Sequence, residues 1–114
     1  MNETIKNILF HIKRSQLAYD FYKKEKKLYQ ALRIYKANQA IYTLLIENGH
    51  LWKHVPDNSI IEYIFHLEDW FEQFDHLASS VKFNLEDEFV FNRFEHSPPF
   101  SNKIIDLITI YRKI

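Results

Sequence analysis

The first half of the chain repeats apolar residues at the spacing of an amphipathic helix. Neither glycine nor proline occurs between Asn2 and Asn48. In the first part of this stretch, apolar residues recur at steps of three and four, at Ile5, Ile8, Ile12, Tyr19 and Tyr22. Ser15 fills the one gap in this pattern. A second run has a similar spacing, at Leu28, Leu32, Tyr35, Tyr42 and Leu45. Because such residues share one face of a helix, both runs are predicted to be helical.

The charged cluster at Lys23–Lys27 is the expected break between these two helices. A single helix over all 47 residues from Asn2 to Asn48 would be unusually long for a domain of this size. A break instead gives an antiparallel helical hairpin. The stretch AYDFYKKEKKLYQALRIYKANQA resembles one tetratricopeptide-type hairpin, in which Tyr22, Ala31 and Tyr35 occupy aromatic, small and aromatic positions. A continuous helix that dimerises along its length is the alternative.

The second helix carries two apolar stripes rather than one. Beside the stripe already named runs another, at Ala31, Ile34, Ala37, Ile41 and Leu44. A helix that is apolar on most sides must be covered on most sides. The second helix is therefore expected at the centre of the fold or at an interface, and Ile34 and Ile41 are assigned to a partner-binding surface.

A third helix is predicted from Ser59 to about Ser80. Gly49 is expected to cap the end of the second helix, the segment after it to form a loop, and Asp57, Asn58 or Ser59 to cap the third helix. The apolar stripe of this helix is Ile60, Ile64, Leu67, Phe71, Phe74 and Ala78, widened by Ile61, Trp70 and Leu77. Its polar side is acidic, at Glu62, Glu68, Asp69, Glu72 and Asp75.

The segment FVFNRFEHSPPF, Phe89–Phe100, differs from these helices because it holds four phenylalanines and two of the three prolines. A short final helix is expected after Pro98 and Pro99, with its buried face at Ile104, Leu107, Ile108 and Tyr111. The whole chain is therefore predicted to be one all-α domain over residues 1–114. Its architecture is a four-helix bundle built on an N-terminal hairpin, with an aromatic-rich crossover before the last helix.

The aromatic crossover has two interpretations. Burying four phenylalanines stabilises the fold by about 6–12 kcal/mol, whereas ordering twelve backbone units costs about 12–24 kcal/mol. The crossover is thus either a strap over the protein's own core that needs further contacts, or an element that faces a partner or a second copy. The candidate partner-binding residues are Phe83, Phe89, Phe91, Arg93, Phe94, Phe100, Ile34 and Ile41.

Composition narrows the classes of function. The absence of cysteine excludes disulfides, thiolate nucleophiles and Cys-ligated metals. A single glycine argues against phosphate-binding loops, nucleophile elbows and dinucleotide-binding motifs. The N-terminus lacks the pattern of a signal peptide, and no apolar run is long enough for a membrane span. We therefore expect a cytoplasmic protein with no cofactor.

The charges are separated along the chain although their sum is zero. Eight basic and two acidic residues lie between His11 and Lys36, whereas ten acidic and two basic residues lie between Asp57 and Glu95. The basic half suggests nucleic-acid binding as an alternative function, because cations contact phosphates and tyrosines such as Tyr19 and Tyr22 stack on bases. The candidate residues for that function are Lys13, Arg14, Lys23, Lys24, Lys26 and Lys27.

The histidines offer only weak candidates for chemistry. His50 and His54, or His66 with Glu62 and Asp69, have spacings at which a helix can present metal ligands, but no carboxylate–histidine motif faces them from another predicted helix. The spacing of Arg93 and His96 does not support a nuclease. The sequence thus predicts a non-catalytic protein–protein interaction module, a small subunit or binding regulator. Nucleic-acid binding is the second hypothesis, and a metal-dependent or nuclease enzyme is the third.

Overall fold

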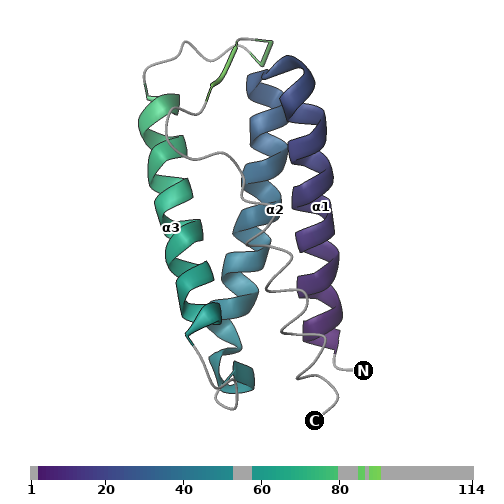
Figure 1. The fold of residues 1–114 in the computed structure, drawn as a ribbon, viewed down its shortest axis with the longest axis vertical. Helices are drawn as coiled ribbons and strands as arrows, with labels where there is room; N and C mark the ends of the chain where they lie inside the picture. Colours follow the sequence, from purple (N-terminus) through teal and green to yellow (C-terminus); the bar gives the residue numbers. More distant parts are fainter. Residues whose placement is uncertain (1–2, 53–57, 80–84, 87, 91–114) are drawn as a thin grey trace.

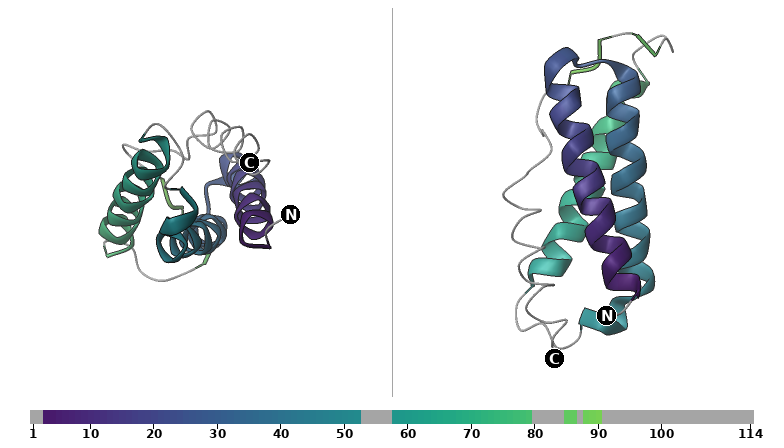
Figure 2. Two further views of the ribbon diagram at one scale, coloured as in Figure 1. Left: turned by 90° about the horizontal axis from the view of Figure 1, so that it is seen from below. Right: turned by 90° about the vertical axis from the view of Figure 1, so that its right-hand side faces the viewer.

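The computed structural model describes residues 3–52, 58–79, 85–86 and 88–90, and these residues form three long helices (Figure 1). The helices are α1 (Glu3–Glu25), α2 (Leu28–Glu47) and α3 (Ser59–Ala78), and a short 3₁₀ helix, η1 (Gly49–Trp52), follows α2. Seen end-on, α1 and α3 lie on two different sides of α2 (Figure 2). The all-α class and the antiparallel hairpin are confirmed, whereas the helix expected after Pro98 and Pro99 lies outside the described residues.

The hairpin turns where the sequence predicted a break, and it does so without glycine. Lys26 adopts a left-handed backbone conformation with φ of 52°. Its N–H donates to the carbonyl of Tyr22 at 2.7 Å, which closes the last turn of α1. The N–H of Lys27 donates to Oε1 of Gln30 at 3.2 Å, which satisfies one of the unpaired donors at the start of α2. A lysine therefore occupies the position where glycine is usual.

Two hydrophobic clusters fill the space between the helices. The cluster near the start of α1 consists of Ile5, Ile8, Ile12, Ile41, Leu45, Ile60, Tyr63 and Leu67. The cluster near the turn consists of Ala18, Tyr19, Tyr22, Leu28, Ala31, Ile34, Trp70, Phe74 and Phe89. Between them a buried hydrogen bond of 2.6 Å joins the Ser15 hydroxyl to Oδ1 of Asn38. A buried polar pair of this kind favours one register of α1 against α2, because any other register separates the two groups and loses their bond.

Ile34 and Ile41, which were expected on a partner-binding surface, are fully buried within the fold. The stripe of α2 that contains them is covered by residues of both neighbouring helices. Burial of each such side chain stabilises the fold by about 1.5–3 kcal/mol. The expected exposure of Ile34 and Ile41 was therefore wrong, and α2 is the central element.

Residues 85–86 and 88–90 pack against the turn of the hairpin and bond to it. The N–H of Tyr29, in the first turn of α2, donates to the carbonyl of Leu85 at 3.0 Å, and the N–H of Phe89 donates to the carbonyl of Lys26 at 2.8 Å. Lys27 and Glu88 form an isolated antiparallel β-bridge. The ring of Phe89 is 1% exposed and lies 5.0 Å from that of Phe74. Phe89 thus closes the protein's own core, which corrects the alternative that it faces a partner.

The end of α2 differs from the prediction. Asn48, not Gly49, caps the helix, and its Nδ2 and backbone N–H both donate to the carbonyl of Leu44, at 2.9 and 3.2 Å. Gly49 has no positive φ and begins η1, in which His50 is exposed. α3 begins at Ser59 as predicted, after Asn58, although Asn58 makes no side-chain capping bond. Among the described helices, none is long and apolar enough to cross a membrane.

Candidate partner-binding groove

The outward face of α1 carries a row of large apolar side chains. Phe10, Leu17 and Phe21 are 61%, 57% and 46% exposed. Steps of seven and four residues place the three on one face of the helix, opposite the face formed by Ile8, Ile12 and Tyr19. We call these three residues the α1 ridge. Single exposed apolar side chains are common, but a row of three is the kind of surface that binds another molecule.

The α1 ridge borders a groove of about 630 Å³ whose other walls are cationic. Lys13 and Arg14 lie between Phe10 and Leu17 on α1, and Arg33 and Lys36 reach the same groove from α2. Ala18, a small buried residue, leaves room at the seam between the two helices. Close by on α1, Nζ of Lys24 lies 5.5 Å from the centre of the Phe21 ring. The groove therefore joins apolar contact area to a cluster of positive charge.

Asp20 is the single acidic residue in the two helix segments that form this groove, and it pairs with Lys23 at 3.5 Å. No Asp or Glu occurs between Glu3 and Asp20, or between Glu25 and Glu47. The four groove cations lie within these two stretches, which contain no carboxylate. Their summed positive potential favours an acidic ligand, more strongly at low salt.

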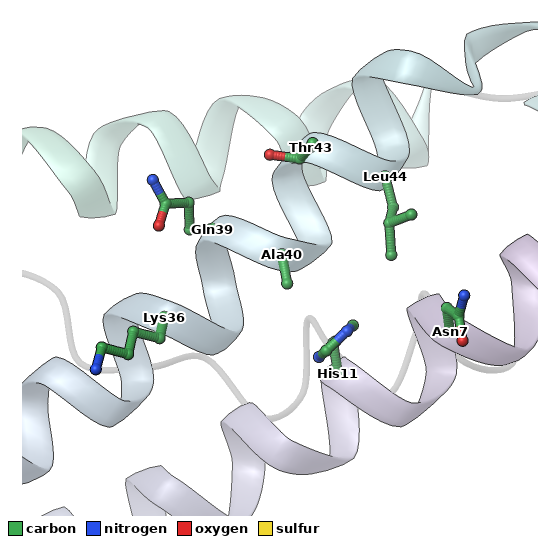
Figure 3. Close-up of a pocket in the computed structure, with 7 residues that line it drawn as sticks. All are labelled: Asn7, His11, Lys36, Gln39, Ala40, Thr43 and Leu44. Atoms are coloured by element: carbon green, nitrogen blue, oxygen red, sulfur yellow. The ribbon is translucent and has the colours of Figure 1, made fainter.

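A second, more polar hollow of about 440 Å³ continues along the seam (Figure 3). Asn7 and His11 contribute from α1, and Gln39, Ala40, Thr43 and Leu44 contribute from α2, while Lys36 belongs to both hollows. Nη1 of Arg14 donates to Nδ1 of His11 at 3.2 Å. Burial, and the positive charge of Arg14, lower the pKa of His11 from 6.5. His11 is therefore neutral near pH 7 and accepts the bond that orients Arg14 beside the groove.

The six cations proposed for nucleic-acid binding do not form one surface. Lys13 and Arg14 lie in the groove and Lys24 lies beside Phe21, but Lys23 pairs with Asp20 at 3.5 Å. Lys26 and Lys27 are half-buried in the turn next to Glu88. Tyr19 and Tyr22, which were expected to stack on bases, are buried. The cations that do converge are Lys13, Arg14, Arg33 and Lys36, all of which belong to the basic half of the chain between His11 and Lys36.

The remaining predicted partner-binding residues, Phe83, Phe91, Arg93, Phe94 and Phe100, lie outside the described residues. His54 and His96 do as well. Within the parts of the chain that the structure places, no group of three or more His, Asp or Glu side chains is arranged to hold a metal ion. His66 is half-buried, and burial lowers its pKa although the nearby Asp69 partly opposes the change.

The comparisons with known proteins give no further assignment. No family model, curated protein or solved structure matches this chain. Its function is therefore inferred from the geometry and charge of the surface itself.

The α1 ridge was missed in the sequence although a signal for it is present. Phe10, Leu17 and Phe21 do not belong to the apolar stripe that starts at Ile5 and lie on a different face of the helix. Their spacing of seven and four residues is itself helical. Because α2 and the aromatic crossover are richer in apolar residues, the surplus apolar surface was predicted there.

Proposed function

We propose that this chain is a non-catalytic protein–protein interaction module that binds its partner in the groove between α1 and α2. The observation that carries the proposal is the row of Phe10, Leu17 and Phe21, each at least 46% exposed, directly beside four cations. Apolar anchors surrounded by charge are the usual composition of a protein-binding surface. We expect the protein to act in the cytoplasm as a small subunit or a binding regulator.

The groove favours a partner segment that is both acidic and amphipathic. An amphipathic helix binds in a groove through anchors one turn apart, and Leu17 and Phe21 have that spacing. Carboxylates beside those anchors would pair with Lys13, Arg14, Arg33 and Lys36. Such pairs contribute more to orientation and association rate than to affinity. The apolar contact supplies the affinity, and the charges select the partner.

Nucleic-acid binding is the second candidate, and the convergence of the same four cations favours it. Phe10 and Phe21, being exposed, are able to stack on bases in place of the buried Tyr19 and Tyr22. Against it stands α3, which carries five acidic residues and neither Lys nor Arg. Its negative charge repels a polyanion that approaches the molecule.

Fluorescence anisotropy with defined probes tests the proposal. The probes are a labelled helical peptide with Leu at positions i and i+4 flanked by Glu, the same peptide with Lys in place of Glu, single-stranded RNA and duplex DNA. We expect binding of the acidic peptide alone. Leu17→Ala/Phe21→Ala should weaken it about tenfold or more, because truncating an interface anchor costs upwards of about 1 kcal/mol.

The matched control is Ile46→Ala, which removes an equally exposed apolar side chain from another face of α2. It should leave binding unchanged. Equal peptide binding by the control and by Leu17→Ala/Phe21→Ala would contradict the groove as the site. Binding of RNA or DNA that is lost in Lys13→Glu/Arg14→Glu would support the second candidate instead.

A further inference from the structure

The outward face of α3 carries a second apolar ridge with the opposite charge. Ile61 and Phe65 are 51% and 59% exposed, so Ile61 does not widen the buried stripe as the sequence suggested. We call these two residues the α3 ridge. The exposed residues around it are acidic, at Glu62, Glu68, Asp69 and Glu72. Between Ser59 and Ala78 the only residues able to carry positive charge are His66 and His76.

The two ridges match in spacing and in the order of their charges. Leu17 and Phe21 are four residues apart, as are Ile61 and Phe65, which is a rise of about 6 Å along a helix. Lys13 and Arg14 lie four and three residues before Leu17, whereas Glu68 and Asp69 lie three and four residues after Phe65. If two such helices pack antiparallel with Phe65 beside Leu17, Ile61 falls beside Phe21, and Glu68 and Asp69 fall beside Arg14 and Lys13.

We propose that the groove between α1 and α2 receives the α3 ridge of a second copy of this chain. This inference rests on the proposed function and names its partner. Within one molecule α1 and α3 lie on different sides of α2 (Figure 2), so the two ridges of one copy do not meet each other. A contact between unlike surfaces is head-to-tail, and it leaves one free ridge at each end of a pair of molecules. Further copies add to these free ridges until a ring closes or no free monomer remains.

Two charge-reversal variants test the contact. Lys13→Glu/Arg14→Glu disables the α1 ridge and leaves the α3 ridge intact, whereas Glu68→Lys/Asp69→Lys does the reverse. All four side chains are exposed, and the bond that Glu68→Lys removes, from the Tyr42 hydroxyl to Glu68 at 2.7 Å, is at the surface. Both variants should therefore fold, which circular dichroism checks. The control is Lys23→Glu, which reverses a charge on another face of α1.

Sedimentation velocity of the full chain gives the readout. We expect the mass of the wild type to rise with concentration beyond that of a dimer, and to fall again in high salt. Each reversal variant alone should be a monomer, and Lys23→Glu should assemble like the wild type. An equimolar mixture of the two reversal variants should assemble again, because the intact α1 ridge of one variant meets the intact α3 ridge of the other, and the two reversed ridges also carry opposite charges.

Three results would overturn self-association: a wild type that stays monomeric at every concentration in low salt, a Glu68→Lys/Asp69→Lys variant that assembles by itself, or a mixture of the two variants that stays monomeric. The acidic peptide separates this outcome from the proposed function. A monomeric wild type that binds the peptide in its groove retains the proposed function and loses the self-association. A monomeric wild type that binds no peptide loses both.

Discussion

The hydroxyl of Tyr22 donates a buried hydrogen bond of 2.6 Å to the backbone carbonyl of Phe89, 67 residues further along the chain. Tyr22 lies in the last turns of α1, and Phe89 belongs to the segment that covers the turn of the hairpin. A second hydrogen bond runs from the N–H of Phe89 to the carbonyl of Lys26, so both backbone polar groups of Phe89 are bonded. The segment is thus fixed by its backbone as well as by the Phe89 ring.

Tyr22→Phe should destabilise the protein by about 1–3 kcal/mol, because it leaves the buried carbonyl of Phe89 without its donor while keeping the ring. Urea denaturation followed by circular dichroism measures the change. The control is Tyr29→Phe, since the hydroxyl of Tyr29 bonds to Glu25 at the exposed surface and water replaces that bond. Equal stability of Tyr22→Phe and wild type would show that the bond does not hold the segment.

Lys26→Gly should stabilise the protein by up to about 1 kcal/mol. Lys26 has a positive φ, which strains any residue with a Cβ and does not strain glycine. The opposite result is expected at Lys13, in the middle of α1, where glycine costs about 1 kcal/mol. Thermal unfolding of both variants gives the comparison. A loss of stability at Lys26 as large as that at Lys13 would contradict the left-handed turn.

Stability should decrease as the pH falls below about 6.5, and His66 should contribute to the decrease. Burial lowers the pKa of His66 in the folded protein below its usual 6.5. The unfolded chain therefore binds more protons than the folded one between these two pKa values. The contribution of His66 is complete above pH 6.5 and is lost as the pH falls through the lowered value.

His66→Gln should make this dependence shallower when chemical unfolding is measured between pH 7.5 and 5. The pKa of His11 is lowered in the same direction, so His11→Gln is the matched comparison, and the double variant should be the least sensitive to pH. A wild-type stability that stays flat across this interval would contradict the burial of both rings.

The three helices were predictable because their apolar periodicity is strong. α3 begins at the predicted residue, since the stripe from Ile60 to Phe74 leaves one reasonable helix face. The position of the hairpin turn was predictable as well, but its mechanism was not. The left-handed conformation of Lys26 has no signature in the residue type, and the Phe89 N–H that bonds to the Lys26 carbonyl comes from a distant part of the chain.

The binding surface was harder to predict than the fold. A sequence shows that α2 has two apolar stripes, but it does not show that α1 and α3 together are large enough to cover both. Ile34 and Ile41 were therefore placed on the surface and are in the core. Apart from Ile46, the exposed large apolar residues of the three helices lie instead on the outer helices, at Phe10, Leu17, Phe21, Ile61 and Phe65, and only the packing shows that they are exposed.

The central claim is that the groove between α1 and α2 binds a partner, and an amide NMR titration tests it most directly. The ligand is the acidic amphipathic peptide, added to ¹⁵N-labelled Glu68→Lys/Asp69→Lys protein so that self-association does not obscure the signals. We predict that shift changes concentrate at Phe10–Phe21 and Arg33–Lys36 and leave α3 unaffected. Shift changes centred on α3 or on the turn at Lys26, or none at saturating peptide, would contradict the claim.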